Sequence, residues 1–321
     1  MMLDSKSARV TRRTIGLVGC GRWGRLVLRD LVALGSRVIV ADVDAAARAD
    51  AQAAGATTTA DADELPQVDG LVVATPAMTH AQVVAALLPR GVPLLVEKPF
   101  TTNTEDAERL TEQGGDRVFI GHTWRYHPGV QLLGEIARSG EIGRVVGLRS
   151  TRTNWTSPRT DVDSVWNLAP HDLTLAIEIL GGIPPPRAAL PEVHEGRAVG
   201  LTALLGDDPW LVFDVSNRYR DKRREVRIHG AHGVAVMADP DLGRIQITRG
   251  DPFSFATDAV DEIRAFSTES ALTRELTAFL KFLDGGPQPI SSAKEGVDVV
   301  RCVARLRELA GLADNDFQHQ R

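Results

Sequence analysis

The sequence predicts an α/β protein in which a doubly wound parallel sheet is followed by a second α/β domain with an open, mostly antiparallel sheet. Between residues 14 and 122, five short apolar runs alternate with amphipathic helical patterns. Strands buried on both faces form such continuous runs, and the helices that connect them cover the sheet. After residue 124, strand-like segments follow one another with short turns between them, which favours antiparallel pairing.

The elements of the first part follow in a regular order. We expect strand 14–18, helix 22–34, strand 37–42, helix 45–55, strand 70–76, helix 79–91, strand 92–99, helix 101–115 and strand 117–122. Thr79 stands three residues before Gln82, and Thr102 three before Glu105. This spacing is typical of a capping box, so we expect both helices to begin at these threonines.

The later part of the chain is expected to carry strands at 143–155, 198–205, 210–219, 224–237 (with an internal turn) and 243–248. Helices are predicted over 172–182, 270–286 and 291–311, the last opening with Ser292 and Glu295 at capping-box spacing. Pro184–Pro186 mark a loop. We divide the 321 residues into a domain over 1–123, a second over 124–290, and a closing helix over 291–321 that packs back on the first domain.

Composition excludes several classes of protein. The net charge is −5, so no basic surface points to nucleic acid or to an anionic membrane. No apolar run approaches the roughly 20 residues that a membrane-spanning helix needs, and the polar residues 1–13 do not resemble a signal peptide. Cys20 and Cys302 have no metal-ligand spacing, so we expect a cytoplasmic protein without a metal.

A glycine-rich turn leaves the first predicted strand and opens the first helix. It carries Gly19, Gly21 and Gly24, and Asp42 ends the second strand. In this context the pattern is the dinucleotide-binding fingerprint: the glycines allow a tight turn, close approach of a pyrophosphate and helix–strand packing. Asp42 would bind ribose hydroxyls, and no lysine or arginine follows within five residues, so NAD is favoured over NADP. The alternatives are a glycine turn without a ligand and a solvated Asp42.

Ligands bind beyond the carboxyl ends of parallel strands, where the sequence places Thr75, Pro76, Lys98 and His122. Lys98 could polarise a reacting hydroxyl and stabilise alkoxide character. The alternative, equally weighted, is that Lys98 forms a surface ion pair with Glu97.

A second group of polar residues lies in the segment 164–182. If Asn167 is the N-cap and Pro170 lies in the first turn, Asn167 and His171 share one face, and Asp172 faces the positive end of the helix dipole. His171 would then be a credible general base. The alternative is a polar first turn with an idle histidine.

These motifs resemble those of the Gfo/Idh/MocA oxidoreductases, and the resemblance covers nearly the whole chain. The similar segments are GLVGCGRWG (16–24), VVATPAMTH (72–80), EKPF (97–100), GHTWRYHP (121–128), SGEIGRVVGLRS (139–150), WNLAPHDLTLAIEILGG (166–182) and PISSAKEGVDVVRCV (289–303). The EKPF match is the most specific of them.

The resemblance implies a Rossmann domain, a cofactor that carries hydride, and a sheet in the second domain through which homodimers or homotetramers form. It implies that Lys98 and His171 are catalytic and that the Lys98–Pro99 bond is cis. Residues expected to contact the cofactor are Gly19, Gly21, Arg22, Trp23, Gly24, Asp42, Thr75, Pro76, His80, Glu97 and Lys98. Residues expected to contact substrate are Arg125, Asn167, Asp172, Trp155 and Trp166, although either tryptophan could equally belong to the core.

One position departs from the family pattern, because many members carry aspartate where this chain has Asn167. Asparagine can position a partner but cannot ionise. The leading hypothesis is an NAD-dependent oxidoreductase that acts on a secondary alcohol or ketone of a sugar, sugar nucleotide or cyclitol. The runner-up is a non-catalytic, NAD- and sugar-binding regulator, and a third hypothesis is a reductase of an imine or a tetrapyrrole.

Overall fold

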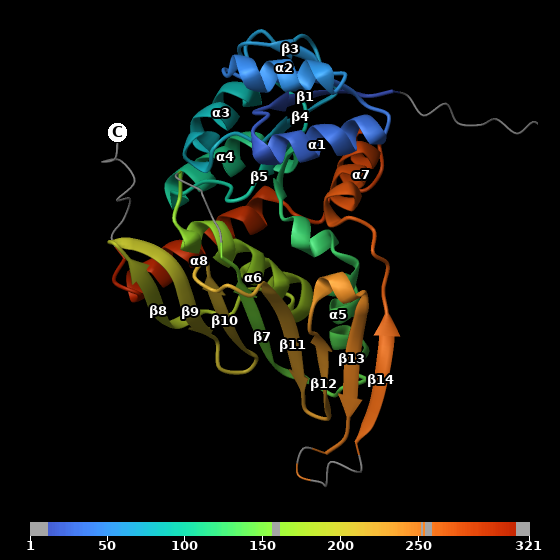
Figure 1. The fold of residues 1–321 in the computed structure, drawn as a ribbon, viewed down its shortest axis with the longest axis vertical. Helices are drawn as coiled ribbons and strands as arrows, with labels where there is room; N and C mark the ends of the chain where they lie inside the picture. Colours follow the sequence, from blue (N-terminus) through green and yellow to red (C-terminus); the bar gives the residue numbers. More distant parts are fainter. Residues whose placement is uncertain (1–11, 156–160, 252, 254–258, 313–321) are drawn as a thin grey trace, which may run out of the picture.

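The computed structural model describes residues 12–155, 161–251, 253 and 259–312. Two sheets lie one above the other, with the N-terminal sheet at the top of Figure 1 and the C-terminal sheet at the bottom. Most of the polar N-terminal segment and the end of the predicted closing segment, residues 313–321, lie outside the described residues.

The N-terminal sheet has six parallel strands in the order β3-β2-β1-β4-β5-β6. The strands are β1 (Thr14–Val18), β2 (Arg37–Ala41), β3 (Thr57–Thr59), β4 (Gly70–Val73), β5 (Leu94–Glu97) and β6 (Val118–Gly121). The order reverses between β1 and β4, so the crevice expected to hold a ligand opens there. The predicted doubly wound sheet is confirmed, and only the short strand β3 was not expected.

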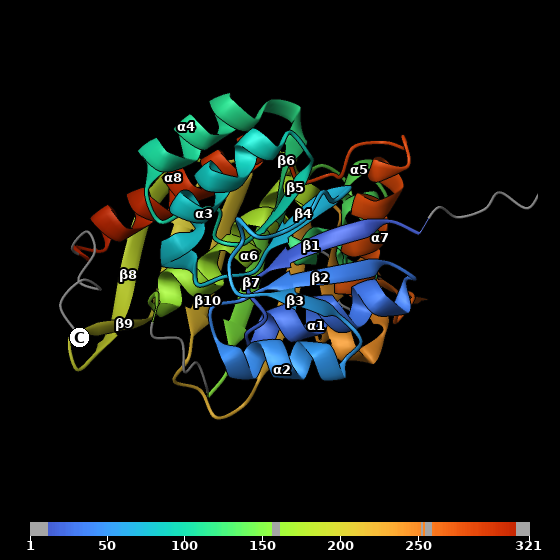
Figure 2. The same ribbon diagram turned by 90° about the horizontal axis from the view of Figure 1, so that it is seen from above.

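Helices cover both faces of this sheet (Figure 2). Helices α1 (Arg22–Ala33) and α2 (Ala45–Ala53) lie on one face, and α3 (His80–Leu87) and α4 (Thr104–Gly114) lie on the other. Short 3-10 turns connect some of these elements: η1 (Ala77–Thr79), η2 (Leu88–Arg90) and η3 (Gly115–Arg117). Helix α7 (Ala271–Leu283) joins α1, because Leu276 and Phe279 pack with Ile15 and Leu31 in one apolar cluster. The sheet is therefore buried on both sides.

The C-terminal sheet has eight strands in the order β14-β13-β12-β11-β7-β10-β9-β8. They are β7 (Val145–Thr153), β8 (Pro186–His194), β9 (Arg197–Leu205), β10 (Trp210–Ser216), β11 (Arg223–Gly230), β12 (Gly233–Met237), β13 (Arg244–Arg249) and β14 (Val260–Ala265). Every pairing is antiparallel except that of β7 with β10. The prediction of a mostly antiparallel sheet is confirmed.

One face of the second sheet is covered by α5 (Pro128–Ser139), α6 (Ser164–Leu180) and α8 (Ala293–Leu309). The turns η4 (Thr123–Tyr126) and η5 (Pro240–Leu242) complete the described elements of this part. Leu148, Leu205, Phe213 and Ile228 are fully buried beneath these helices. Helix α8 also packs against α4, so it contacts both halves of the molecule.

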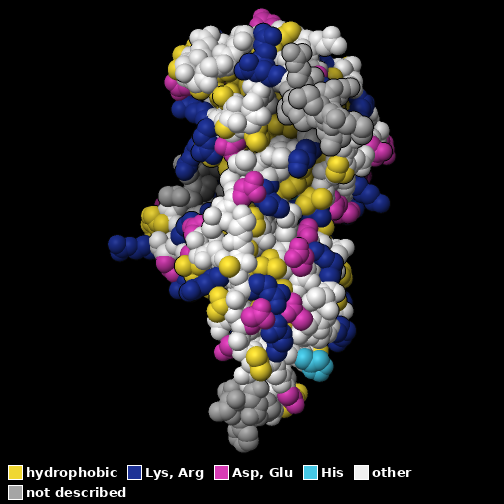
Figure 3. Space-filling view, turned by 90° about the vertical axis from the view of Figure 1, so that its right-hand side faces the viewer, with side chains coloured by type: hydrophobic (Ala, Val, Ile, Leu, Met, Phe, Trp, Pro, Cys, Tyr) yellow, Lys and Arg dark blue, Asp and Glu magenta, His cyan; other side chains and the backbone are white. Residues whose placement is uncertain are grey.

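The edge strand β14 is bordered by a network of charges. Glu141, just after α5, pairs with Arg249 and Arg264, and both arginines also pair with Glu262 of β14. Basic and acidic side chains are interspersed over the lower part of the molecule when this side is viewed directly (Figure 3). Charges on an edge strand discourage pairing with another chain.

The starts of α4 and α6 differ from the sequence-based expectation, whereas α3 begins after Thr79 as expected but lacks the side-chain cap. Helix α4 is capped by Asn103, whose side chain accepts from the amide of Asp106, and not by Thr102. Thr79 precedes α3 but forms no side-chain cap, because its hydroxyl donates to the carbonyl of Pro76. The capping box of Ser292 is confirmed.

The start of α6 was also predicted wrongly. Its N-cap is Asp163, whose side chain accepts from the amide of Trp166, so Asn167, Pro170 and Asp172 all lie inside the helix. Aspartate is as good an N-cap as asparagine, and α6 therefore begins one turn earlier than expected.

Within the described residues, no helix is long and apolar enough to cross a membrane. The same residues contain no group of three or more histidine, cysteine or acidic side chains that could hold a metal ion.

Candidate functional site

The three glycines of the turn after β1 occupy positions with different demands. Gly19 has φ of +89°, and a Cβ there would lie 2.7 Å from the amide of Thr75. A Cβ on Gly24 would lie 2.3 Å from the carbonyl oxygen of Gly19, so only glycine lets α1 pack this close. A Cβ on Gly21 would meet nothing within 4 Å, so Gly21 faces open space. A dinucleotide-binding turn requires these three properties: a tight turn at the first glycine, room for the pyrophosphate at the second, and close helix packing at the third.

The first turn of α1 is open to an anion. Gly21 is its N-cap and supplies no side-chain cap, and the first turn carries no acidic residue. The free amides of a helix start attract negative charge, so this end of the 12-residue helix fits a pyrophosphate.

Asp42 lies directly after β2, beside the glycine turn. Its Oδ2 accepts from the amide of Cys20 at 2.6 Å and its Oδ1 from the amide of Asp44 at 2.8 Å. Arg48 donates to the backbone carbonyls of Asp42 and Val43 at 2.7 and 3.0 Å. The carboxylate is therefore fixed at the crevice, and Arg48, the first arginine after it in the sequence, holds the loop behind it.

Other residues expected to contact the cofactor border the same crevice. Arg22 is exposed at the start of α1. The indole Nε1 of Trp23 donates to Oε1 of Glu97, a buried carboxylate at the end of β5. This hydrogen bond joins the glycine turn to the strand that carries Lys98.

Thr75 and Pro76 follow β4, and His80 lies beneath them. His80 is buried, and its Nε2 and Nδ1 lie 2.9 Å from the carbonyl of Thr75 and 2.8 Å from that of Pro99. The imidazole thus braces two loops that border the crevice, and the structure places it behind them. The Lys98–Pro99 peptide bond is cis, as expected.

Lys98 reaches from the first domain to α6. Its Nζ donates to the backbone carbonyl of Asn167 at 2.9 Å and to the side-chain Oδ1 of Asn167 at 3.0 Å. Pro170 has no backbone N–H, so the carbonyl of Trp166 lacks its usual helical hydrogen bond. The carbonyl that Lys98 binds is that of the next residue, Asn167. The lysine therefore points toward α6, while Glu97 turns toward Trp23.

His171 lies one helical turn beyond Asn167. Its ring is 6.5 Å from that of Trp124, edge to face, and it is half-buried. Burial lowers the pKa of His171 well below its usual value, and the positive charges of Lys98, Arg152 and Arg224 lower it further. The imidazole is therefore neutral at neutral pH and can accept a proton.

His122 at the end of β6 has a different environment. It is buried, its Nδ1 has no hydrogen-bond partner among the described residues, and burial lowers its pKa to about 3. The positive charges of Arg125 and Lys98 contribute to that shift, so Lys98 is close to both histidines.

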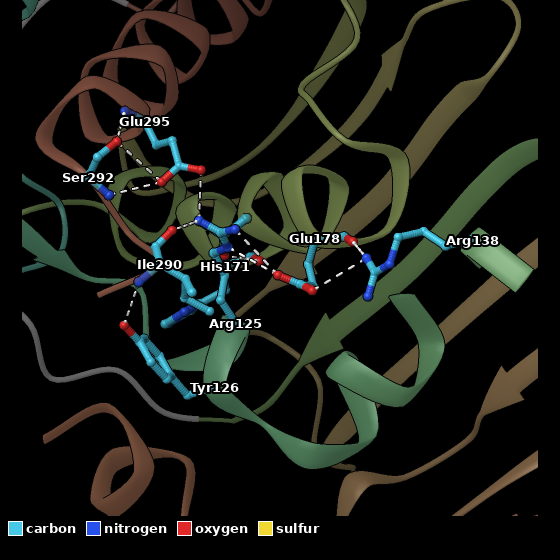
Figure 4. A network of polar contacts seen from close by, with 9 residues as sticks. Arg125, Tyr126, Arg138, His171, Glu178, Ile290, Ser292 and Glu295 are labelled. Atoms are coloured by element: carbon cyan, nitrogen blue, oxygen red, sulfur yellow. Dashed lines mark hydrogen bonds and ion pairs between the residues drawn. The ribbon is translucent and has the colours of Figure 1, made fainter. Parts of the chain in front are cut away.

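Arg125 is buried between α6 and α8 (Figure 4). Its guanidinium pairs with Glu178 at 3.3 Å and with Glu295 at 2.8 Å, and it also donates to the carbonyl of Ile290. Arg138 pairs with Glu178 from the other side. Because Arg125 pairs with Glu178 of α6 and with Glu295 of α8, it joins these two helices.

Three of the residues expected to bind substrate are placed differently. Asp172 is fully buried, and its Oδ2 accepts from Nε of Arg152 at 3.0 Å. Trp166 is 3% exposed within the apolar core. Trp155 is 60% exposed and lies 5.9 Å from the guanidinium of Arg218. Of the predicted set, Asn167 is the residue that accepts hydrogen bonds from Lys98.

The structure adds residues to the site that the sequence did not single out. Trp124 stacks against His127 and faces His171, and the guanidinium groups of Arg152 and Arg224 lie over its ring. Trp124 lies in the GHTWRYHP segment, whose resemblance to the family could have marked it as a site residue. No sequence pattern marked Arg152 and Arg224, because only the register of β7 with β11 brings them together.

A second addition is Glu275 on α7. It is buried and accepts from the hydroxyl of Thr123 at 2.8 Å. Burial raises its pKa well above the usual value, and the charge of Glu97 raises it further. Glu275 is therefore expected to be a neutral acid beneath the site.

Comparison with known proteins agrees with this geometry. Residues 13–120 match the family model described as "Oxidoreductase family, NAD-binding Rossmann fold". A myo-inositol dehydrogenase of Streptomyces leeuwenhoekii is 33% identical over 312 residues, which cover 90% of this chain and 94% of that protein. A UDP-N-acetylglucosamine 3-dehydrogenase of Acidithiobacillus ferrooxidans is 32% identical over 196 residues, which cover 59% of this chain but only 58% of the relative.

Solved structures share the whole fold. That of the Acidithiobacillus enzyme superposes with a TM-score of 0.79 at 25% identity and covers 92% of this chain and 97% of its own. A levoglucosan dehydrogenase solved with NADH and levoglucosan gives a TM-score of 0.82 at 16% identity over 93% of this chain and 97% of its own, which shows the fold alone.

Fold, glycine turn and family model together define a Rossmann-fold oxidoreductase of the NAD-binding type. The chain belongs to the Gfo/Idh/MocA family, as its motifs predicted.

Proposed function

We propose that this protein is an NAD-dependent dehydrogenase that interconverts a secondary alcohol and a ketone on a sugar, sugar nucleotide or cyclitol. The observation that carries the proposal is that Lys98, at the carboxyl edge of the parallel sheet, donates to Asn167 one helical turn before His171 and helps to keep that imidazole neutral. A cation and a proton acceptor side by side are what oxidation of a hydroxyl requires.

The residues have distinct roles in this proposal. His171 takes the proton of the substrate hydroxyl, because its lowered pKa keeps the imidazole neutral. Lys98 donates a hydrogen bond to the same oxygen and stabilises its developing negative charge. Asn167 holds the Lys98 ammonium through two acceptors, so an amide supplies the positioning that many relatives obtain from aspartate. A bound nicotinamide supplies the hydride acceptor.

The preference for NAD over NADP is supported by Asp42 and Arg48. The carboxylate of Asp42 is fixed by two backbone amides at the place where a ribose would lie, and its charge would repel a 2′-phosphate. Arg48 is engaged with backbone carbonyls and so is not poised to bind that phosphate.

The positions of the side chains change which residues we propose to bind substrate. We retain Asn167, add Trp124, and leave Trp155 as a candidate because it is exposed. For Arg125, Asp172 and Trp166 we propose structural roles, since each is buried against protein partners. His80 acts behind the cofactor loops by bracing the carbonyls of Thr75 and Pro99.

The substrate class is supported by relatives whose names specify inositol and UDP-N-acetylglucosamine. We also propose a homodimer or homotetramer formed through the uncovered face of the second sheet. Leu190 and Leu204 are 71% and 40% exposed on β8 and β9, and Ile263 is 60% exposed on β14. A cytoplasmic location and the domain limits at residues 123 and 290 remain predictions.

The test is to incubate the protein with NAD⁺ or NADP⁺ and panels of cyclitols, sugars and sugar nucleotides, and to follow NADH or NADPH absorbance. Turnover of at least one secondary alcohol, faster with NAD⁺, is expected. Tight NAD⁺ binding without turnover of any panel member, including the corresponding ketones with NADH, would favour a regulatory protein. Turnover only of imines or tetrapyrroles would favour the third hypothesis.

A further inference from the structure

Two arginines lie directly opposite each other in the second sheet, next to the proposed reacting groups. Arg224 of β11 is the cross-strand partner of Arg152 of β7. Leu148 and Ile228 on the same strands are buried, and each is four residues from one of the arginines, so both arginines project from the face that α6 covers. Like charges directly opposite each other destabilise a sheet, so this pair needs a compensating anion.

The protein compensates only one of the two charges. Arg152 is buried, its Nε donates to Asp172 at 3.0 Å, and its guanidinium lies 4.2 Å from the centre of the Trp124 ring. Asp172 is thus committed to Arg152. This half of the pair is a complete buried ion pair stacked on an aromatic ring.

Arg224 has no such partner. Its guanidinium lies 5.8 Å from the Trp124 ring, and it forms no hydrogen bond or ion pair with any residue that the structure describes. Three acidic residues, Asp241, Asp239 and Asp172, raise the pKa of Arg224 by their charge, and each also has another partner. Asp239 accepts from the amide of Asp241, and Asp241 pairs with Lys222 at 3.1 Å. Arg224 is half-buried, so part of its charge still faces solvent or a ligand.

The unpaired guanidinium borders the proposed reaction site. The Arg224 guanidinium lies 5.8 Å and the His171 ring 6.5 Å from the ring of Trp124, so the indole neighbours both groups. Burial and the charge of Arg152 lower the pKa of Arg224, and its own charge lowers the pKa of His171. Three cations, Lys98, Arg152 and Arg224, therefore act on His171.

We propose that Arg224 forms an oxyanion subsite and that the substrate is an anionic sugar or cyclitol derivative, carrying a carboxylate or a phosphate. The planar guanidinium matches either group with two parallel hydrogen bonds. Trp124 lies beside Arg224, while in this proposal the reacting hydroxyl lies at Lys98 and His171. This inference rests on the proposed dehydrogenase function and specifies its substrate class.

The test uses pairs of probes that differ only in the anionic group. D-Glucuronate and D-glucose 6-phosphate are each compared with D-glucose, and D-galacturonate with D-galactose, by calorimetric titration of the NADH complex. The variants are Arg224→Gln, which removes the charge, and Arg224→Lys, which keeps it. Arg227→Gln is the matched control, because Arg227 is on the same strand, faces the opposite side and pairs with Glu225.

We expect at least one acidic probe to bind about 10-fold or more tightly than its neutral counterpart, as for a hydrogen bond to a charged group. Arg224→Gln should abolish that preference, Arg224→Lys should keep part of it, and Arg227→Gln should keep all of it. Preference for uronates alone assigns a carboxylate, and preference for the phosphate alone assigns a phosphate. Equal binding of acidic and neutral probes to the wild type, or an unchanged preference in Arg224→Gln, overturns the inference.

The same probes separate this inference from the proposed function. Turnover of neutral sugars without any preference for anions would retain the dehydrogenase and reject the subsite. Binding of uronates that depends on Arg224, in a protein that oxidises no alcohol, would retain the subsite and reject the dehydrogenase.

Discussion

Substitution by alanine should affect folding stability differently at two glycines of the turn after β1. Gly21→Ala places a methyl group in open space, at a backbone conformation of φ −66° and ψ −161° that alanine adopts. Alanine is a poorer N-cap than glycine but loses less backbone entropy on folding, so these effects nearly cancel, to within about 0.5 kcal/mol. Gly21→Ala should therefore fold normally.

Gly24→Ala creates a clash with the backbone. The new Cβ would lie 2.3 Å from the Gly19 carbonyl oxygen, whereas real Cβ contacts essentially never fall below 3.0 Å. That oxygen cannot rotate aside, so the helix and turn must separate. Overpacking costs about 1–3 kcal/mol, and the higher helix propensity of alanine returns up to about 1 kcal/mol. A net loss of about 1–2 kcal/mol is expected.

The assay combines urea denaturation with titration of NAD⁺. Gly21→Ala should keep the wild-type free energy of unfolding but bind NAD⁺ at least about 10-fold more weakly, because its methyl group occupies the approach of the pyrophosphate at a cost of about 1.4 kcal/mol or more. Gly24→Ala should lose stability as well. Wild-type NAD⁺ affinity in Gly21→Ala, or wild-type stability in Gly24→Ala, would refute the assignment of this turn.

Two further predictions concern buried and reacting groups. Asp172→Asn leaves the Arg152 guanidinium buried without a counter-ion and should cost about 3 kcal/mol in urea denaturation; a loss below about 1 kcal/mol would show that Arg152 finds another partner. Because the pKa of His171 is lowered, the imidazole stays neutral as the pH falls through its usual value of 6.5. In the oxidation direction kcat/KM should therefore stay flat through that pH and fall only in more acidic solution, and a decline centred near 6.5 would contradict the assigned environment.

The parallel sheet could be predicted because its signals are local. Each strand is a continuous apolar run, and the glycines have steric reasons to be where they are, as Gly24 shows. The parallel pairing of the strands followed from their alternation with helices, and the expected position of the site came from the rule that ligands bind at the carboxyl edge.

The errors have equally local causes. The start of α6 was misplaced because Asn167 and Asp163 are both good caps, and Pro170 normally marks a first turn. Strand β8 was missed because Pro186 and Pro191 argue against a strand, yet an edge strand tolerates both. Helix α5 was not predicted at all, although Pro128 at its first turn and Gly140 after its end are typical helix signals.

The roles of single side chains could not be read from spacing. Asp172 is adjacent to His171 in sequence, but a helix turns the two apart, and Asp172 enters the core to meet Arg152. Arg152 and Arg224 are brought together by the register of β7 with β11, which depends on the whole sheet. Such long-range pairs leave no periodic trace in the sequence.

The central claim is that Lys98 and His171 perform the chemistry while the glycine turn holds the cofactor. The direct measurement is kcat with the best substrate of the panel, together with the Kd of NAD⁺, for Lys98→Ala and His171→Ala. The exposed Lys281→Ala and His232→Ala serve as controls. Each active-site variant should lose about 100-fold or more in kcat with NAD⁺ affinity largely kept, as expected for loss of an acid–base or electrostatic group. Full activity in both variants would contradict the account.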